Sequence, residues 1–215
     1  MRPVPHVDAA ALAGMIDPAH TALIVVDVQE DFAAPHGAVA RAGADMSGVA
    51  PALARIEALL AAAREAGVTV AFTRVMTSPR TDSAALKLLH ARGGEAADSL
   101  ALCRAGERGS AYHHLAPAAD DIEVEKRLYD AFHETDLEAQ LRARGVETLV
   151  LVGFSTHCCV DATARAAFHR DFNVFIISDA SDSYDPDAHW ATLRALRSSC
   201  ALIAVASAAI AAWRG

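Results

Sequence analysis

The chain has 215 residues, which is enough for one domain with a full hydrophobic core, and we expect residues 1–215 to form that domain. Hydrophobic residues make up 53% and charged residues 21%, a globular rather than disordered composition. The formal net charge of −8, without a long basic run, argues against nucleic acid or an anionic membrane surface as the main partner.

The sequence shows no targeting or membrane-spanning segment. The first 20 residues carry one basic residue and a short apolar stretch interrupted by Asp8, which does not fit a secretory signal. The apolar run "ALIAVASAAIAAW" has 13 residues and is too short to cross a bilayer. We therefore expect a soluble cytoplasmic protein with free thiols at its four cysteines, Cys103, Cys158, Cys159 and Cys200.

Short apolar runs alternate with helical patterns along the chain. The runs cover 21–28, 68–75, 121–126, 147–154, 173–180 and 200–207, and those at 21–28, 147–154 and 173–180 are rich in Val and Ile, as buried strands are. Helical patterns cover 49–67, 135–145, 159–171 and 187–199. Gly67 and Gly145 occupy positions typical of helix C-termini, and Thr135 or Asp136 would suit an N-cap.

This alternation predicts an α/β fold: a doubly wound, three-layer sandwich, Rossmann-like, with a central parallel sheet of about six strands. Helices should cover both faces through right-handed crossovers. Residues 76–118 form the least regular part, with weak helical signals and several glycines. A segment this long between two strands favours a substrate-covering excursion over a linker.

Reactive side chains follow three of the predicted strands, at the sheet edge where open parallel sheets bind ligands. They are Asp27, Lys126 and the pair Cys158–Cys159, which begins a predicted helix. Each also has a structural interpretation: a capping aspartate, a solvated lysine, and two buried cysteines. A helix N-terminus and a nearby ammonium both favour a thiolate, so together the three supply a nucleophile, a base and a balancing cation.

Three ordered segments carry a resemblance to the isochorismatase-like cysteine hydrolases, which include nicotinamidases, N-carbamoylsarcosine amidases, biuret hydrolases, maleamate amidases and ureidoacrylate hydrolases. "LIVVDVQEDF" resembles the first strand of that family, hydrophobic-D-x-Q-x-D-F. "EKRLYDAFHETDL" resembles its lysine segment, and "GFSTHCCVDATA" resembles its cysteine segment, G-x-x-T-x-x-C-V-x-x-T-A. The resemblance runs from about residue 20 to the end and is loosest over 76–118.

The resemblance implies a catalytic triad. Asp27 matches the general base of the family, Lys126 its lysine and Cys159 its nucleophile, whereas Cys158 falls on a variable position. The family has a cis peptide before the nucleophile, which by offset would be Phe154–Ser155. The backbone amides of Ser155 and Cys159 are then the candidates for an oxyanion hole.

Further positions match the surroundings of the family's pocket less specifically. Phe32 and Phe132 match aromatic positions there, although plain core packing explains them as well. Arg74 follows the second predicted strand and could bind a carboxylate or ureido oxygen of the substrate, or form a surface salt bridge.

The sequence departs from the nicotinamidases at their metal site. Their D-x-H pattern after the second strand is missing from "FTRVMTSPRTD", and the adjacent His113 and His114 are poorly spaced to ligate one metal. We therefore predict no catalytic metal and no cofactor, and we disfavour nicotinamide as the substrate. Members of the family are commonly oligomers, so a homo-oligomer, dimer or tetramer, is expected.

These observations predict a cysteine-dependent amidohydrolase. It would cleave a C–N bond in a small linear amide, ureido or carbamoyl compound through a thioester on Cys159. One alternative is a non-covalent ether hydrolase of the isochorismatase type, in which Cys159 would be dispensable. The other is a catalytically idle binding or assembly protein of the same fold.

Overall fold

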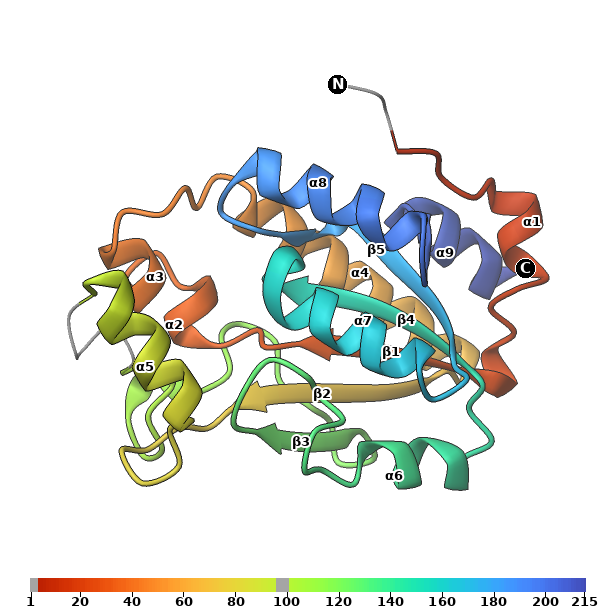
Figure 1. Cartoon of the computed structure of the whole chain (residues 1–215). Helices are drawn as coiled ribbons and strands as arrows, with labels where there is room; N and C mark the ends of the chain where they lie inside the picture. The colour runs from red at the N-terminus through yellow and green to blue at the C-terminus, as the bar shows by residue number, and fades with distance from the viewer. Residues whose placement is uncertain (1–3, 96–100) are drawn as a thin grey trace.

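The computed structural model describes residues 4–95 and 101–215 and contains one sheet of six parallel strands (Figure 1). The strands are β1 (Thr21–Val26), β2 (Thr69–Val75), β3 (Ile122–Lys126), β4 (Thr148–Phe154), β5 (Asn173–Asp182) and β6 (Leu202–Ala204). Their order is β3-β2-β1-β4-β5-β6, and every neighbouring pair is parallel. The predicted fold class is therefore confirmed.

Helices cover both faces of this sheet and enclose two hydrophobic clusters. One face carries α1 (Ala9–Ala13), α4 (Val49–Ala66) and α9 (Ala206–Arg214), and the other carries α6 (Leu137–Ala143), α7 (Asp161–Phe168) and α8 (Pro186–Arg197). In Figure 1, α7 lies in front of the sheet and α4 behind it. Strand β1 is buried on both sides, because Leu23 and Val25 point into one cluster while Ile24 and Val26 point into the other.

Local signals explain most of the element boundaries. Helix α4 ends at Gly67, whose φ of 75° is left-handed, as expected for a glycine C-cap. Helix α8 begins with Pro186 after Asp185, whose carboxylate accepts from the amides of Asp187 and Ala188. At α6, Asp136 occupies the N-cap position without a side-chain capping bond to the backbone, and Thr135 Oγ1 accepts from the Leu137 amide at 3.4 Å.

Two predicted boundaries differ from the structure. The apolar run 200–207 forms only the three-residue β6, because its last residues begin α9. The helix predicted from 159 starts earlier, with the π-helical turn η4 (Thr156–Val160) running directly into α7. The short elements η1 (Pro18–His20), α2 (Glu30–Ala33), α3 (Ala38–Arg41), α5 (Ala84–Gly93) and η3 (Arg108–Ser110) were not predicted individually.

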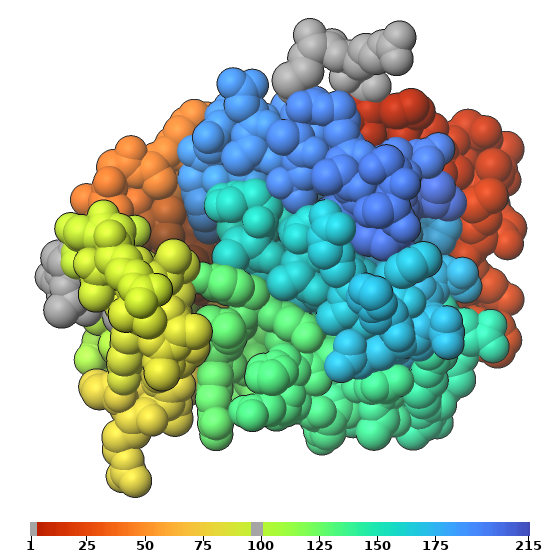
Figure 2. Space-filling view, in the orientation of Figure 1, coloured from red at the N-terminus to blue at the C-terminus, as the bar shows by residue number. Residues whose placement is uncertain are grey.

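The excursion between β2 and β3 lies beyond the carboxyl ends of the strands. Figure 1 shows its helix α5 beside α2 and α3 at that end of the sheet. In the space-filling view, the yellow-green atoms of α5 form the left flank of the molecule, next to the green atoms that follow β3 (Figure 2). Part of this excursion, residues 96–100, lies outside the described residues.

The strand order reverses between β1 and β4, which places a topological switch point at their carboxyl ends. Val26, the last residue of β1, pairs with Thr73 on one side and with Gly153 on the other. Gly153 has a φ of 114°, and a Cβ at this position would lie only 2.1 Å from the Val26 carbonyl oxygen. Only glycine therefore fits where β1 and β4 approach each other. No helix in residues 4–95 and 101–215 is long and apolar enough to cross a membrane.

Candidate active site

Asp27 follows β1 directly, has a φ of 52° and is completely buried. Thr73 of β2 holds it in two ways: its carbonyl accepts from the Asp27 amide at 3.1 Å, and its hydroxyl donates to Asp27 Oδ1 at 2.7 Å. The other carboxylate oxygen, Oδ2, lies 2.7 Å from Lys126 Nζ. Asp27 is therefore a paired buried carboxylate, as burial of a charge demands.

Lys126 ends β3, and its side chain is also fully buried. Its ammonium donates to the carbonyls of Leu128 at 2.8 Å and Tyr129 at 3.0 Å, and its ion pair with Asp27 is not aligned as a hydrogen bond. Burial lowers the pKa of Lys126, but the adjacent Asp27 and Cys159 outweigh it, so the net shift is upward. The ammonium form of Lys126 is therefore favoured, and it lies 2.7 Å from Asp27 Oδ2.

Cys159 and Cys158 lie in η4, immediately after β4, and differ in exposure. Cys159 is buried at 6% exposure, whereas Cys158 is partly exposed. A hydrogen bond between the two thiols raises the pKa of Cys159 and lowers that of Cys158. Burial raises the pKa of Cys159 further, and Lys126 opposes these effects without overcoming them. The net shift of the Cys159 pKa is therefore upward, which favours the thiol and agrees with a reaction in which a base takes its proton.

The Cys159 side chain lines a cavity of about 290 Å³ at the switch point. Ser155 and Phe32 also line it, whereas Asp27 and Lys126 lie buried beside Cys159, outside the cavity wall. A larger surface groove of about 590 Å³ at the opposite end of the strands, near Phe168, contains none of the predicted catalytic residues. We therefore assign the smaller cavity as the candidate active site.

The oxyanion-hole candidates lie at the entry to η4. The Phe154–Ser155 peptide bond is cis, at the position that the resemblance implied. Among the turn, loop and cap hydrogen bonds between backbone groups of the described residues, none has the Ser155 amide or the Cys159 amide as its donor. The carbonyl of Ser155, in contrast, accepts from the amides of Cys158 and Val160, both at 3.1 Å. The backbone around the nucleophile is thus fixed by the turn itself.

Two of the predicted substrate-binding residues do not line this cavity. Arg74 pairs with Glu123 at 3.1 Å and with Glu125 at 2.5 Å, so its charge is neutralised by β3. Phe132 is buried in the core against Phe172, with ring centroids 5.8 Å apart. The structure therefore places Arg74 and Phe132 outside the wall of this cavity, and their predicted contact with the substrate stays a prediction.

An arginine does line the cavity, but it is Arg127, the residue after Lys126. It pairs with Glu134 at 3.5 Å, and both side chains are exposed. Arg127 was not predicted, because nothing in the sequence distinguishes it from an ordinary surface arginine beside Lys126.

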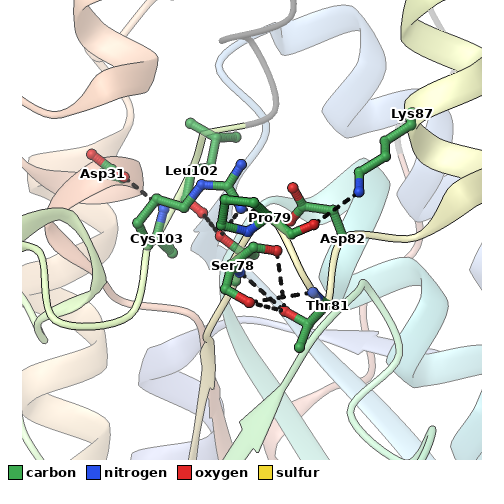
Figure 3. Close-up of polar contacts among 10 residues, drawn as sticks. Asp31, Ser78, Pro79, Thr81, Asp82, Lys87, Leu102 and Cys103 are labelled. Carbon is green, nitrogen blue, oxygen red and sulfur yellow. Dashed lines mark hydrogen bonds and ion pairs between the residues drawn. The ribbon is translucent and has the colours of Figure 1, made fainter.

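Two polar residues of the first motif shape the site without being predicted to do so. Gln29 is buried and holds Val75, since Oε1 accepts from the Val75 amide at 2.7 Å and Nε2 donates to its carbonyl at 2.9 Å. Asp31 accepts from the Cys103 amide at 2.7 Å and so anchors the loop that carries Leu102 (Figure 3). The spacing D-x-Q-x-D was the available signal, because buried polar side chains at a strand end need partners.

Residues 4–95 and 101–215 contain no group of three or more His, Cys, Asp or Glu side chains arranged to hold a metal ion. His113 instead contacts Glu30 at 3.0 Å, and His114 lies 3.7 Å from Glu57. The absence of a catalytic metal stays a prediction, which rests on the missing D-x-H pattern.

Comparison with known proteins places the chain in a family. The family described as Isochorismatase domain matches residues 21–208. Ureidoacrylate amidohydrolase RutB from Methylobacterium radiotolerans is 38% identical over 185 residues, which cover 80% of this chain and 71% of that protein. The protein of the same name from Stutzerimonas stutzeri is 36% identical over 179 residues, covering 78% and 71%. The crystal structure of a cysteine hydrolase from Pseudomonas syringae pv. phaseolicola superposes with a TM-score of 0.78 at 27% identity and covers 99% of this chain and 98% of that one. The chain therefore belongs to the isochorismatase domain family.

Proposed function

We propose that this protein is a metal-independent cysteine hydrolase that cleaves a C–N bond in a small ureido, carbamoyl or linear amide compound. The observation that carries the proposal is the buried ion pair of Asp27 and Lys126, 2.7 Å apart, beside a thiol that lines a cavity. Relatives named ureidoacrylate amidohydrolase agree with this class of reaction and favour the ureido compounds within it.

In the first half of the proposed reaction, Asp27 Oδ2 takes the proton of the Cys159 thiol as the sulfur attacks the substrate carbonyl carbon. A C–S bond forms, and the negative charge moves to the carbonyl oxygen, where the amides of Ser155 and Cys159 stabilise it. The C–N bond then breaks, and Asp27 returns its proton to the departing nitrogen. The products of this half are an acylated Cys159, which is a thioester from an amide or a thiocarbamate from a ureido compound, and free ammonia or amine.

In the second half, Asp27 takes a proton from a water molecule that attacks the carbonyl carbon of the acylated Cys159. A C–O bond forms, the C–S bond breaks, and the sulfur recovers its proton from Asp27. Lys126 stays protonated throughout, because its pKa is raised and its ammonium is held by two carbonyls as well as by Asp27. Its role is to pair with the Asp27 carboxylate and to balance the charge on the sulfur.

The test is an ammonia-release screen over ureidoacrylate, N-carbamoyl amino acids, biuret, maleamate and nicotinamide, with wild-type protein and three variants. Cys159→Ser and Asp27→Asn should each abolish turnover of the best substrate, and Cys158→Ser is the matched control. Mass spectrometry of quenched wild-type reactions should detect an acyl group on the peptide that contains Cys159.

The result also separates the alternatives. An active Cys159→Ser protein that still needs Asp27 would contradict the covalent scheme and indicate ether-type hydrolysis without a thioester. Wild-type protein with no turnover and with ordinary thiol reactivity would instead indicate a binding protein of this fold.

A further inference from the structure

The cavity above Cys159 has an apolar wall. Aliphatic and aromatic side chains from separate parts of the chain line it: Phe32, Val39, Val75, Leu86, Leu102 and Phe154. Polar side chains come from the nucleophile segment and from other parts of the chain: Ser155, His157, Cys158 and Cys159, and also Thr77, His90, Arg127, Tyr129 and Tyr184. The cavity thus combines polar groups with aliphatic side chains, such as Leu86 and Leu102, that offer a ligand no hydrogen-bonding partner.

Two hydroxyl groups on the wall, those of Tyr184 and Thr77, are already used by the protein. Tyr184 donates its hydroxyl to the Phe32 carbonyl at 2.9 Å, and Thr77 donates to the Leu102 carbonyl at 2.5 Å. Each therefore offers the cavity its carbon atoms and not a free hydrogen-bonding group. A polar substrate group placed against this wall would lose its water without gaining a partner, which is unfavourable.

The apolar wall is held in place by buried polar contacts. Arg104 pairs with Asp82 at 2.6 Å, with both side chains largely buried, and Arg104 also donates to Thr77 Oγ1 at 3.2 Å. Figure 3 shows Asp82, which lies just before α5, close to Leu102 and Cys103, with Asp31 bonded to the Cys103 amide. These contacts fix Leu86 of α5 and Leu102 relative to each other, so the wall is preorganised for a ligand.

The cavity also has room beyond a ureido group. Its volume of about 290 Å³ is close to the range of roughly 300–1,000 Å³ typical of sites that enclose a drug-sized ligand. A ureido group at Cys159 would leave the apolar part of the cavity to another portion of the substrate.

From these observations we infer that the substrate carries an apolar substituent of several carbons beside its C–N group, and that Leu86 and Leu102 select for it. The inference rests on the proposed hydrolase function and narrows it to ureido or carbamoyl compounds with an aliphatic side chain. It makes Leu86 and Leu102 specificity-determining residues, because they line the same cavity as the nucleophile.

The test uses N-carbamoyl derivatives of glycine, alanine, valine and leucine, which share the ureido and carboxylate groups and differ only in side chain. Burial of each added methylene is expected to raise kcat/KM about fourfold, so the leucine derivative should exceed the glycine derivative by at least about tenfold. The asparagine derivative, similar in size to leucine but polar, should lose this gain. Values of kcat/KM that stay constant or fall from the glycine to the leucine derivative would overturn the inference.

Substitutions in the cavity wall test which residues determine the preference for an aliphatic side chain. Leu86→Asn and Leu102→Asn should each lower the leucine-to-glycine ratio of kcat/KM at least about fivefold. Leu89→Asn is the matched control, because Leu89 lies on the same helix, is 65% exposed and is not part of the cavity wall. An unchanged ratio in both cavity variants would overturn their assignment.

A binding measurement separates this inference from the proposed chemistry. The same four compounds are titrated calorimetrically against Cys159→Ala protein, where affinity should rise with side-chain size whichever bond the enzyme cleaves. Rising affinity without any turnover by wild-type protein would contradict the proposed function alone. Turnover of N-carbamoylglycine or ureidoacrylate without rising affinity would contradict the apolar substituent alone.

Discussion

The two oxygens of Asp27 have different surroundings, and this difference assigns their roles. Oδ1 accepts a hydrogen bond from the Thr73 hydroxyl at 2.7 Å, whereas Oδ2 faces the Lys126 ammonium in an ion pair without hydrogen-bond alignment. Oδ2 therefore retains a lone pair for the thiol proton. Thr73, which does not line the cavity, acts as a positioning residue for the base.

Replacing the Thr73 hydroxyl tests this role. Thr73→Val keeps the shape of the side chain but removes the donor, and a hydrogen bond to a charged group contributes about 1.5–3 kcal/mol. We expect kcat/KM to fall about 10- to 100-fold. Thr73→Ser keeps the donor and should restore the rate, and a Thr73→Val enzyme with the wild-type kcat/KM would refute the assignment.

The neighbouring thiols also divide their roles. Adjacent residues of a helix point about 100° apart, so a single bound substrate faces only one of them. The hydrogen bond between the thiols raises the pKa of Cys159, so Cys158→Ala should lower that pKa and make Cys159 more reactive at neutral pH. The measurement is the pH dependence of iodoacetamide alkylation, with Cys158 and Cys159 separated by peptide mass spectrometry. An unchanged midpoint for Cys159, or loss of turnover in Cys158→Ser, would show that Cys158 has another role.

At the level of elements, the site depends on the close approach of β1 and β4. These strands carry Asp27 and Cys159 at their carboxyl ends, and Gly153 lies where they come closest. The pairing between β4 and β5 shifts register between Leu151 and Gly153, which allows the end of β4 to bend. The glycine of the G-x-x-T motif therefore allows β1 and β4 to pack closely, and this packing brings Asp27 and Cys159 to the same site.

Gly153→Ala should separate the two strands. The added methyl group would meet the Val26 carbonyl at 2.1 Å, and the φ of 114° is also unfavourable for alanine. We expect the free energy of unfolding to fall by about 2 kcal/mol or more and activity to be lost. Gly106→Ala is the matched control, because Gly106 has a φ of 80° and an added methyl group there would meet no atom within 4 Å. Equal destabilisation of both variants by urea denaturation would argue against a specific clash at Gly153.

At the scale of the whole molecule, the sequence predicted the sheet and the residues that meet at its switch point. Strand and helix periodicity is local, and parallel strands bring Asp27, Lys126 and Cys159 to one edge once the alternation is recognised. The position of Arg74 was not predictable in this way, because its partner depends on the register that sets it opposite Glu125. The register between strands that are distant in the sequence depends on the tertiary structure and cannot be read from a local pattern.

The residues that line the cavity could not be predicted from the sequence for a related reason. Residues 76–118 have weak periodicity, and the described part is organised by long-range polar contacts such as Asp31 to the Cys103 amide. No local pattern encodes a contact between residues 72 positions apart. The prediction that this excursion covers the substrate agrees with the placement of Leu86 and Leu102 in the cavity, but their role in selectivity required the three-dimensional arrangement.

The buried His189 links the nucleophile turn to the stability of the whole fold. Its Nδ1 lies 2.9 Å from Thr156 Oγ1 at the start of η4, and its ring makes a further hydrogen bond to the backbone of Ser178 in β5. Burial lowers the pKa of His189 below its usual value near 6.5, and nearby Asp182 opposes that shift only in part. The neutral imidazole is therefore the form that the folded protein accommodates.

This pKa shift predicts how stability depends on pH. As the pH falls through about 6.5, unfolded chains bind a proton at this histidine while folded chains do not, so the free energy of unfolding decreases until the folded His189 is protonated too. Urea denaturation should show wild-type protein to be less stable at pH 5.5 than at pH 7.5, and His189→Asn should reduce that difference. His157→Asn is the control, because His157 is exposed and its replacement should leave the difference unchanged. A His189→Asn protein with the wild-type dependence on pH would show that other groups cause it.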